Sequence, residues 1–312
     1  MAVRHPSMRK AVLAGERTAD SVHRARAAAL RRRRVAIAAA ASRPPVGAVA
    51  IAPRFLRAAG PRGVGTLVAE GDSWFDYPGE DVLDALESGH GYEIESAAHH
   101  GDRIEEMAYV EQQYRGFCRT LEKLLRRGEL PRAILLSGGG NDVAGDEFFT
   151  LLDHARSASP GLNEDIVRGV IDVRVRNAYV SLLAALTRLC LDTTGHAVPI
   201  LVHGYGRAVP DGRGFLGGWW FLPGPWLRPG FQHKGFLDQE RNRETIAVLI
   251  DRFNAMVEAV AAGFPHVRYV DLRDLLPNGA GYRRWWKDEL HPTQRGFRRI
   301  AGRFAQVIGT LR

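Results

Sequence analysis

Short apolar runs alternate with longer helical patterns from Thr66 to the C-terminus, and this alternation constrains the fold more than any other feature. Five apolar runs have the length and composition of buried strands, namely 66–69, 92–96, 133–136, 198–202 and 267–270. Helical patterns lie between and after them, at 82–87, 104–127, 165–190, 240–262 and 294–311. Because strands separated by helices are joined by crossovers, we predict a five-stranded parallel sheet covered on both faces, a three-layer α/β/α sandwich.

The N-terminal part of the chain carries the excess positive charge. Residues 1–65 hold fourteen Lys and Arg against two acidic residues, a local charge of +12, whereas residues 66–312 hold 29 against 33, a charge of −4. Positions 7–41 are rich in Ala, Arg and Leu and lack Pro, so they favour a helix that Gly15 weakens locally. Prolines and glycines then recur as in a linker. We predict a basic helical arm and linker in residues 1–64 and one domain in residues 65–312.

The basic arm allows three interpretations. Four arginines at 31–34 precede an apolar stretch at 35–41, a layout similar to an atypical N-terminal export signal. The charge would alternatively attach the arm weakly to an anionic surface such as nucleic acid or a membrane. The third interpretation, which we favour, is a solvated or docked helix of a cytoplasmic protein, because no aromatic residue interrupts the basic run. The sequence does not indicate an oligomeric state.

Composition excludes several classes of protein. The body of the chain has no apolar run of about 18 or more uncharged residues, so it is not expected to cross a membrane as a helix. The only cysteines are Cys118 and Cys190, too few for a disulfide scaffold or a cysteine-rich zinc site. One disulfide between them stays open at this point.

Residues that can carry chemistry follow the predicted strands. Ser73 comes directly after the first strand, Gly101 after the second, and Asn141 after the third, behind three consecutive glycines. Because the carboxyl ends of parallel strands meet at one edge of a sheet, we expect these residues to lie close together. Near the C-terminus, Asp288 precedes His291 by three residues, so its carboxylate can reach the imidazole and fix its tautomer. Each of these motifs alone has a structural alternative. Ser73 or Asn141 can cap a helix, the glycines can form turns, and an Asp-x-x-His pair can lie exposed on the surface.

Four blocks of the sequence together resemble the SGNH, or GDSL-like, hydrolases. In the order of that family they are Gly71-Asp72-Ser73, Gly101, Gly139-Gly140-Asn141-Asp142 and Asp288-Glu289-Leu290-His291-Pro292. The resemblance spans residues 65–312 and implies the flavodoxin-like sandwich of that family. It implies an esterase or lipase, or a carbohydrate O-acetyl esterase, that acts on a small-molecule, glycan or lipid ester through an acyl-enzyme. It implies no metal and no organic cofactor.

The resemblance also implies a role for each matching residue. Ser73 would be the nucleophile, His291 the general base and Asp288 the residue that orients the histidine. The backbone N–H groups of Ser73 and Gly101 and the side-chain amide of Asn141 would form the oxyanion hole. These roles suit the chemistry, since a neutral hydroxyl needs an adjacent base and a developing oxyanion needs fixed donors. A thioesterase or an acyltransferase would use the same residues.

The chain departs from the family pattern around the expected site. Trp74 replaces the usual small aliphatic residue after the serine, and His99-His100 precedes Gly101. Residues 207–235 are rich in Gly, Pro and aromatic side chains, which predicts a functional loop or lid. The candidate substrate-binding residues are Trp74, Trp219, Trp220, Trp285 and Trp286. The alternative is that the pairs Trp219-Trp220 and Trp285-Trp286 pack the loop against the body.

Three other classes are weaker matches. A metal-dependent phosphoesterase would use Asp72, His99, Asp142 and His203, but the first strand lacks an Asp-x-His. A standard α/β-hydrolase needs a Gly-x-Ser-x-Gly elbow, which this sequence does not contain. A non-catalytic binding module attached through the arm is expected to have lost a catalytic residue, and none is lost. The sequence therefore predicts a hydrolase that acts on ester bonds.

Overall fold

A five-stranded parallel sheet forms the centre of the computed structural model, which describes residues 6–41, 64–215 and 223–311. The strands are β1 (Thr66–Gly71), β2 (Glu93–Ser96), β3 (Ala133–Ser137), β6 (Ile200–His203) and β7 (Val267–Val270). Their order across the sheet is β2-β1-β3-β6-β7, and every neighbouring pair is parallel. This is the flavodoxin-like order, and all five predicted strands are confirmed.

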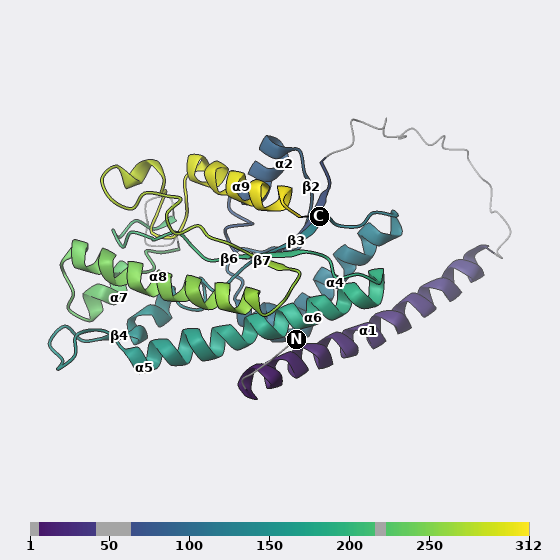
Figure 1. Ribbon diagram of the computed structural model, residues 1–312, viewed down its shortest axis with the longest axis horizontal. Coiled ribbons are helices and arrows are strands. Elements are labelled where there is room, and N and C mark those ends of the chain that lie inside the picture. The colour runs from purple at the N-terminus through teal and green to yellow at the C-terminus, as the bar shows by residue number, and fades with distance from the viewer. Residues whose placement is uncertain (1–5, 42–63, 216–222, 312) are drawn as a thin grey trace.

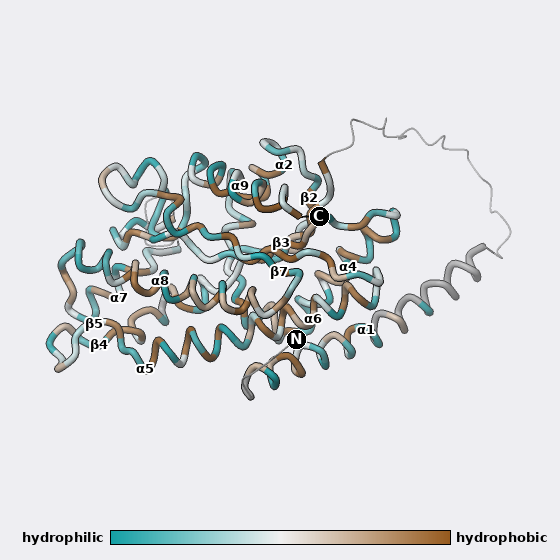
Figure 2. The backbone as a smooth tube through the Cα atoms, in the orientation of Figure 1, coloured by the Kyte–Doolittle hydropathy of each residue, from teal (hydrophilic) through white to brown (hydrophobic). Residues whose placement is uncertain are grey.

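Helices cover both faces of the sheet, as the predicted sandwich requires (Figure 1). On one face lie α2 (Val82–His90) and α9 (Gln294–Gly309). On the other lie α4 (Glu111–Arg126), α6 (Arg176–Thr194) and α8 (Gln239–Ala262). Every residue of β1, β3 and β6 is buried, which explains why these strands are almost continuously apolar. Figure 2 shows the hydrophobic residues gathered along the central strands and the helix faces against them.

Two of the predicted helices are interrupted. The helix expected at 104–127 breaks at Val110, whose extended backbone separates α3 (Ile104–Tyr109) from α4. The helix expected at 165–190 consists of α5 (Glu164–Val167), a π-helical segment η2 (Arg168–Val175) and α6. Neither interruption was predicted from the hydrophobic pattern.

The segment expected to be a loop at 207–235 is only partly irregular. It contains the short helix α7 (Arg228–His233), in which Pro229 lies in the first turn, where a proline costs no hydrogen bond. Residues 216–222 of this segment lie outside the described residues. The small elements η1 (Gly145–Leu151), β4 (Leu152–Asp153), β5 (Gly161–Leu162) and η4 (Tyr282–Arg284) were not predicted.

The predicted N-terminal helix is α1 (Pro6–Ala41), which packs along α6 on the outside of the sandwich (Figure 1). Ala11, Gly15, Ala19 and Val22 form its buried face. A Cβ atom added to Gly15 would lie 2.0 Å from the carbonyl oxygen of Ser181, so this glycine permits the close approach of the two helices. The predicted linker at 42–63 lies outside the described residues, and the division of the chain at residue 64 stays a prediction.

No helix in the described ranges combines the length and hydrophobicity that a membrane crossing requires. Cys118 and Cys190 are both buried thiols, so the disulfide left open by the sequence is not formed.

Candidate active site

Ser73, Gly101 and Asn141 lie at one edge of the sheet, beyond the carboxyl ends of β1, β2 and β3. Strand β2 lies on one side of β1, and the next strand along the chain, β3, lies on the other side. The strand order therefore reverses at β1. In open α/β sheets the crevice at such a reversal is the usual place for a binding site. The fold therefore brings the three sequence candidates to the position where a site is expected.

A chain of short hydrogen bonds joins Ser73 to the C-terminal segment. The Ser73 Oγ lies 2.8 Å from His291 Nε2, and His291 Nδ1 lies 2.8 Å from Asp288 Oδ1. When Nδ1 donates its proton to the carboxylate, Nε2 is left as an acceptor for the serine hydroxyl. This arrangement can remove a proton from Ser73 and hold the resulting positive charge beside a carboxylate.

The carboxylate of Asp288 is buried and accepts further hydrogen bonds. Oδ1 accepts from the backbone N–H groups of Leu290 at 2.9 Å and His291 at 2.8 Å, and Oδ2 accepts from the Tyr77 hydroxyl at 3.2 Å. Burial raises the pKa of Asp288. The hydrogen bond from His291, the charge of the His291 imidazolium and the two backbone donors outweigh burial, so the pKa of Asp288 lies below its ordinary value. Asp288 is therefore held in its ionised form.

Tyr77 is a site residue that sequence reasoning missed. Its ring lies against the imidazole of His291, with ring centroids 4.5 Å apart. Burial raises the pKa of Tyr77, as does the neighbouring Asp288, so the hydroxyl keeps its proton and donates to the carboxylate. The hydrogen bond between Tyr77 and Asp288 joins segments 211 positions apart, so the sequence pattern could not predict it. The sequence showed only that a tyrosine follows Ser73 by four residues.

Hydrogen-bond donors surround the position next to Ser73. Among the described residues, the backbone N–H groups of Ser73 and Gly101 have no hydrogen-bond acceptor. Gly101 adopts φ +89°, a conformation that favours glycine. The Asn141 amide donates one hydrogen to the carbonyl of Asp102 at 2.9 Å, which fixes its orientation and leaves its second hydrogen available. These groups can together bind an oxygen atom that gains negative charge.

The two loops that carry Ser73 and Asn141 are tied together below the site. Asp72 accepts hydrogen bonds from the backbone N–H of Trp74 at 3.0 Å, from the Ser137 hydroxyl at 2.7 Å and from the Tyr205 hydroxyl. The same Tyr205 oxygen accepts from the N–H of Gly140 at 3.1 Å. One buried hydroxyl therefore links the loop after β1 to the loop after β3.

The residues that suggested a two-metal site have other partners. The carboxylate of Asp72 is occupied as described, and Asp142 accepts from the N–H groups of Ile104 at 2.9 Å and Glu105 at 3.4 Å, which caps α3. His203 is buried with its Nδ1 2.6 Å from the carbonyl of Gly204. The exposed rings of His99 and His100 stack on each other, with centroids 4.5 Å apart. Asp72 and Asp142 thus hold a loop and a helix end in place.

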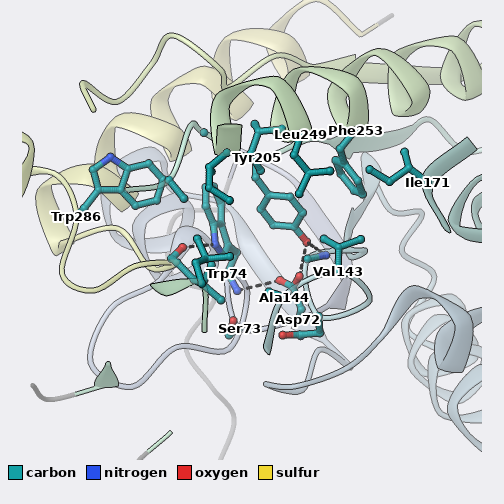
Figure 3. Close-up of a pocket in the computed structure, with 18 residues that line it drawn as sticks. Asp72, Ser73, Trp74, Val143, Ala144, Ile171, Tyr205, Leu249, Phe253 and Trp286 are labelled. Carbon is teal, nitrogen blue, oxygen red and sulfur yellow. Dashed lines mark hydrogen bonds between the residues drawn. The ribbon is translucent and has the colours of Figure 1, made fainter. Parts of the chain in front are cut away.

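Two hollows meet at Ser73 and Asn141. The outer cleft has a volume of about 320 Å³ and is open to solvent. Besides those two residues, its walls include Tyr77, His100, Gly101, Phe215, Trp226 and His291. The inner hollow is smaller, about 60 Å³, less open to solvent than the outer cleft and lined mostly by apolar surface (Figure 3).

Glu289 is a second residue that sequence reasoning missed, although it lies inside the last sequence block. Its buried carboxylate accepts hydrogen bonds from four backbone N–H groups, those of Gly212 (2.9 Å), Trp226 (2.7 Å), Leu227 (2.7 Å) and Arg228 (3.1 Å). Burial raises the pKa of Glu289 above its ordinary value, against the lowering effect of these four donors. Glu289 thus fastens both described ends of the 207–235 segment to the turn that holds Asp288 and His291.

The candidate tryptophans occupy different positions. Trp74 and Trp286 are buried neighbours with ring centroids 6.4 Å apart, and both line the inner hollow. Trp285 lies under the guanidinium groups of Arg295 and Arg299, at 4.6 and 4.9 Å, and lines neither hollow, so its expected place in the binding site is corrected. Trp219 and Trp220 lie outside the described residues. Trp226, which was not a candidate, lines the outer cleft, with its ring 5.3 Å from that of His291.

Comparison with solved structures finds matches of low sequence identity. An α/β hydrolase from the metagenome of Lake Arreo is 16% identical, with 80% of this chain and 97% of that chain covered and a TM-score of 0.43. An acetylxylan esterase from Geobacillus stearothermophilus is 15% identical, with 79% and 95% covered and a TM-score of 0.40. A protein from Arabidopsis thaliana is 16% identical, with 75% and 69% covered and a TM-score of 0.42.

Comparison with curated proteins finds no match. A sequence model described as the GDSL-like Lipase/Acylhydrolase family matches residues 59–299. This match includes Ser73, Gly101, Asn141, Asp288 and His291. Because it covers most of the chain, the protein belongs to the GDSL-like lipase/acylhydrolase family and is an enzyme that hydrolyses ester bonds.

Proposed function

We propose that this enzyme hydrolyses carboxylic esters through an acyl-enzyme formed on Ser73. The observation that carries the proposal is the hydrogen-bond chain from Ser73 to His291 to Asp288, with 2.8 Å at each step. Serine is a weak nucleophile unless a base removes its proton during attack, and this chain places a base at that proton. The family to which the chain belongs supports ester bonds as the target.

The first half of the reaction acylates the serine. His291 Nε2 takes the hydroxyl proton as Ser73 Oγ forms a bond to the ester carbonyl carbon. The carbonyl oxygen becomes an oxyanion, which the N–H groups of Ser73 and Gly101 and the amide of Asn141 stabilise. When the bond to the alcohol oxygen breaks, His291 gives its proton to that oxygen and the alcohol leaves. Asp288 stabilises the imidazolium between these two transfers.

The second half of the reaction releases the acid. Water takes the place of the alcohol, and His291 removes one of its protons as its oxygen attacks the acyl carbonyl carbon. The same three donors stabilise the second oxyanion. The bond to Ser73 Oγ then breaks, and His291 returns a proton to the serine. Free carboxylic acid and the original enzyme result, and water is the only second reactant.

The outer cleft supports a bulky substrate group. Tyr77, Phe215 and Trp226 present aromatic rings next to Ser73, and aromatic rings pack well against sugar rings and hydrocarbon. An acetylated glycan, a small ester and a lipid ester are thus the substrate types to compare. Thioester hydrolysis and acyl transfer to another acceptor would use the same residues, so both belong in the same assay.

The experiment measures hydrolysis of p-nitrophenyl acetate, an acetylated sugar and an acyl thioester by wild type, Ser73→Ala and His291→Ala. We expect each variant to lose about 10⁴-fold or more in kcat, since both residues act in every proton transfer. Ser157→Ala is the matched control because Ser157 is an exposed loop serine. Turnover within tenfold of wild type in Ser73→Ala would overturn the proposal and favour a non-catalytic role for this site.

A further inference from the structure

The inner hollow next to Ser73 differs from the outer cleft in its lining. Its apolar lining includes Val143, Ala144, Ile171, Leu249 and Phe253 (Figure 3). Four of these five side chains are buried, and all five are apolar. The polar groups of Ser73 and Asn141 lie at the end of the hollow that meets the outer cleft. The Tyr205 hydroxyl donates a hydrogen bond to the carboxylate of Asp72, so these two polar groups satisfy each other. The hollow therefore suits a hydrocarbon group that is attached to a polar centre at Ser73.

The position of His291 tells which part of an ester the hollow would take. His291 lines the outer cleft and does not line the inner hollow. In the proposed reaction His291 gives its proton to the departing alcohol oxygen, so the alcohol lies on the side of the outer cleft. The acyl group stays bound to Ser73 and points away from the leaving group. That leaves the inner hollow for the acyl chain.

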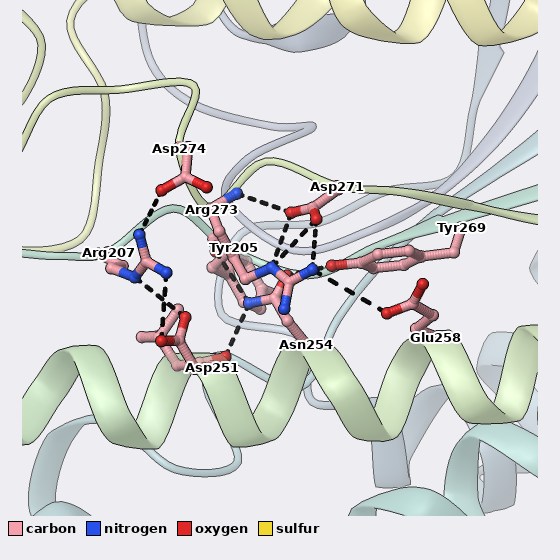
Figure 4. Close-up of polar contacts among 10 residues, drawn as sticks. Tyr205, Arg207, Asp251, Asn254, Glu258, Tyr269, Asp271, Arg273 and Asp274 are labelled. Atoms are coloured by element: carbon pink, nitrogen blue, oxygen red, sulfur yellow. Dashed lines mark hydrogen bonds and ion pairs between the residues drawn. The ribbon is translucent and has the colours of Figure 1, made fainter.

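The walls of the hollow are held in place by contacts that lie outside it. Phe253 packs against Tyr205, with ring centroids 5.5 Å apart, and a Cβ atom on Gly139 would lie 2.6 Å from its ring. On the same helix, Asn254 donates to the carbonyl of Tyr205 at 3.0 Å. Asp251 binds the guanidinium of Arg207 at 3.0 Å (Figure 4). Helix α8 is thus fixed to the segment after β6, and the hollow is not expected to widen for a long chain.

The volume of the hollow limits the length of the acyl chain. An apolar protein cavity of about 150 Å³ binds benzene, a molecule of six carbons. The inner hollow has about 60 Å³, which is less than half of that volume. Resting on the proposed function, we propose that the inner hollow is the acyl-binding site and selects short unbranched acyl groups of two to four carbons. The substrate class is then a short-chain ester of a larger alcohol, with the alcohol in the outer cleft.

The test measures kcat/KM for p-nitrophenyl acetate, butanoate, hexanoate and octanoate. We expect wild type to lose at least tenfold between butanoate and hexanoate, because a methylene without room typically costs tenfold or more. Leu249→Ala enlarges the hollow, so it should raise the ratio of hexanoate to butanoate turnover at least tenfold. Ile171→Val is a milder second variant that should raise the same ratio about threefold.

The matched control is Leu121→Ala, which removes an equally buried leucine from α4, away from both hollows. It should lower the melting temperature and leave the chain-length ratios of wild type unchanged. A wild-type profile that is flat to octanoate, or ratios that neither Leu249→Ala nor Ile171→Val changes, would overturn the acyl-site proposal. Ser73→Ala separates this failure from failure of the proposed function, because it abolishes turnover of all four esters only if Ser73 is the nucleophile.

Discussion

Two regions of the molecule are built in opposite ways. One is the proposed catalytic edge of the sheet, where Ser73, His291 and Asp288 meet, and the other is the N-terminal helix α1. At the edge, buried polar groups from distant segments meet, and Asp288 alone accepts four hydrogen bonds. Helix α1 instead docks on α6 through small residues, with Gly15 against the backbone of Ser181. Its ion pairs, such as Arg188 with Asp20 at 3.8 Å, are largely exposed and contribute little. Loss of one polar atom should therefore damage function at the edge, whereas α1 should tolerate change without loss of activity.

The charge of the chain follows the same division. The arm holds a net charge of +12 and the rest of the chain −4, and all proposed catalytic residues lie in the second part. The basic pI of the whole chain thus says little about the substrate. Attachment of the arm to an anionic surface stays a prediction.

The largest effect in this comparison is expected at Asp288, after the Ser73 and His291 variants described above. Asp288→Asn keeps the shape of the side chain but favours the wrong tautomer of His291, so we expect kcat to fall about 10³- to 10⁴-fold with KM changed less than threefold. Steady-state kinetics on a short-chain ester measures this. Asp238→Asn is the control, because Asp238 also accepts two backbone N–H groups but at the distant start of α8. A loss below tenfold in Asp288→Asn would remove Asp288 from the proposed triad.

A smaller effect is expected at Glu289. Glu289→Gln leaves one carbonyl oxygen, so two of the four backbone donors in the 207–235 segment lose their acceptor. Because this segment carries Trp226 and Phe215 in the outer cleft, we expect KM for esters of bulky alcohols to rise about tenfold. The KM for a methyl ester should change less than threefold. Equal changes for both esters would mean that Glu289 supports the fold without shaping the cleft.

The lowered pKa of Asp288 also predicts a pH dependence of stability. A carboxylate whose pKa is lower in the folded state stabilises that state above its unfolded pKa and loses this contribution as the pH falls through the folded pKa. The free energy of unfolding of wild type minus that of Asp288→Asn should therefore shrink as the pH falls below about 4. Urea denaturation at each pH measures it. A difference that grows on acidification would contradict the ionised state assigned to Asp288.

The smallest effect on activity is expected in the arm. Gly15→Leu places a side chain where the backbone of Ser181 lies, so α1 should separate from α6. Hydrogen exchange in residues 8–23 should increase at least tenfold while ester hydrolysis stays within twofold of wild type. Ser21→Leu introduces the same side chain at an exposed position of α1 and should change neither property. A tenfold loss of activity in Gly15→Leu would show that the arm and the catalytic edge are coupled.

The features that the sequence predicted correctly are those that a local hydrophobic pattern determines. The five strands and the sandwich are confirmed, since buried strands and amphipathic helices have a period that can be read from the chain. The proximity of Ser73, Gly101 and Asn141 was predictable because the carboxyl ends of parallel strands share an edge, whereas the contact of Ser73 with His291 was expected only from the family resemblance. The break at Val110 and the π-helical segment were not predicted from that period. Sequence-distant contacts were equally invisible, among them the links of Tyr205 to Asp72 and of Glu289 to the 207–235 segment.

Trapping the acyl-enzyme tests most directly whether Ser73 is the nucleophile. Wild-type enzyme is mixed with excess p-nitrophenyl butanoate, stopped with acid during turnover and measured by intact-mass spectrometry, and the labelled peptide is then sequenced. If Ser73 is the nucleophile, we expect an added mass of one butanoyl group, located on Ser73, and no such mass on Ser73→Ala. Full turnover with the butanoyl group on another residue, or undiminished turnover by Ser73→Ala, would contradict the assignment of Ser73 as nucleophile.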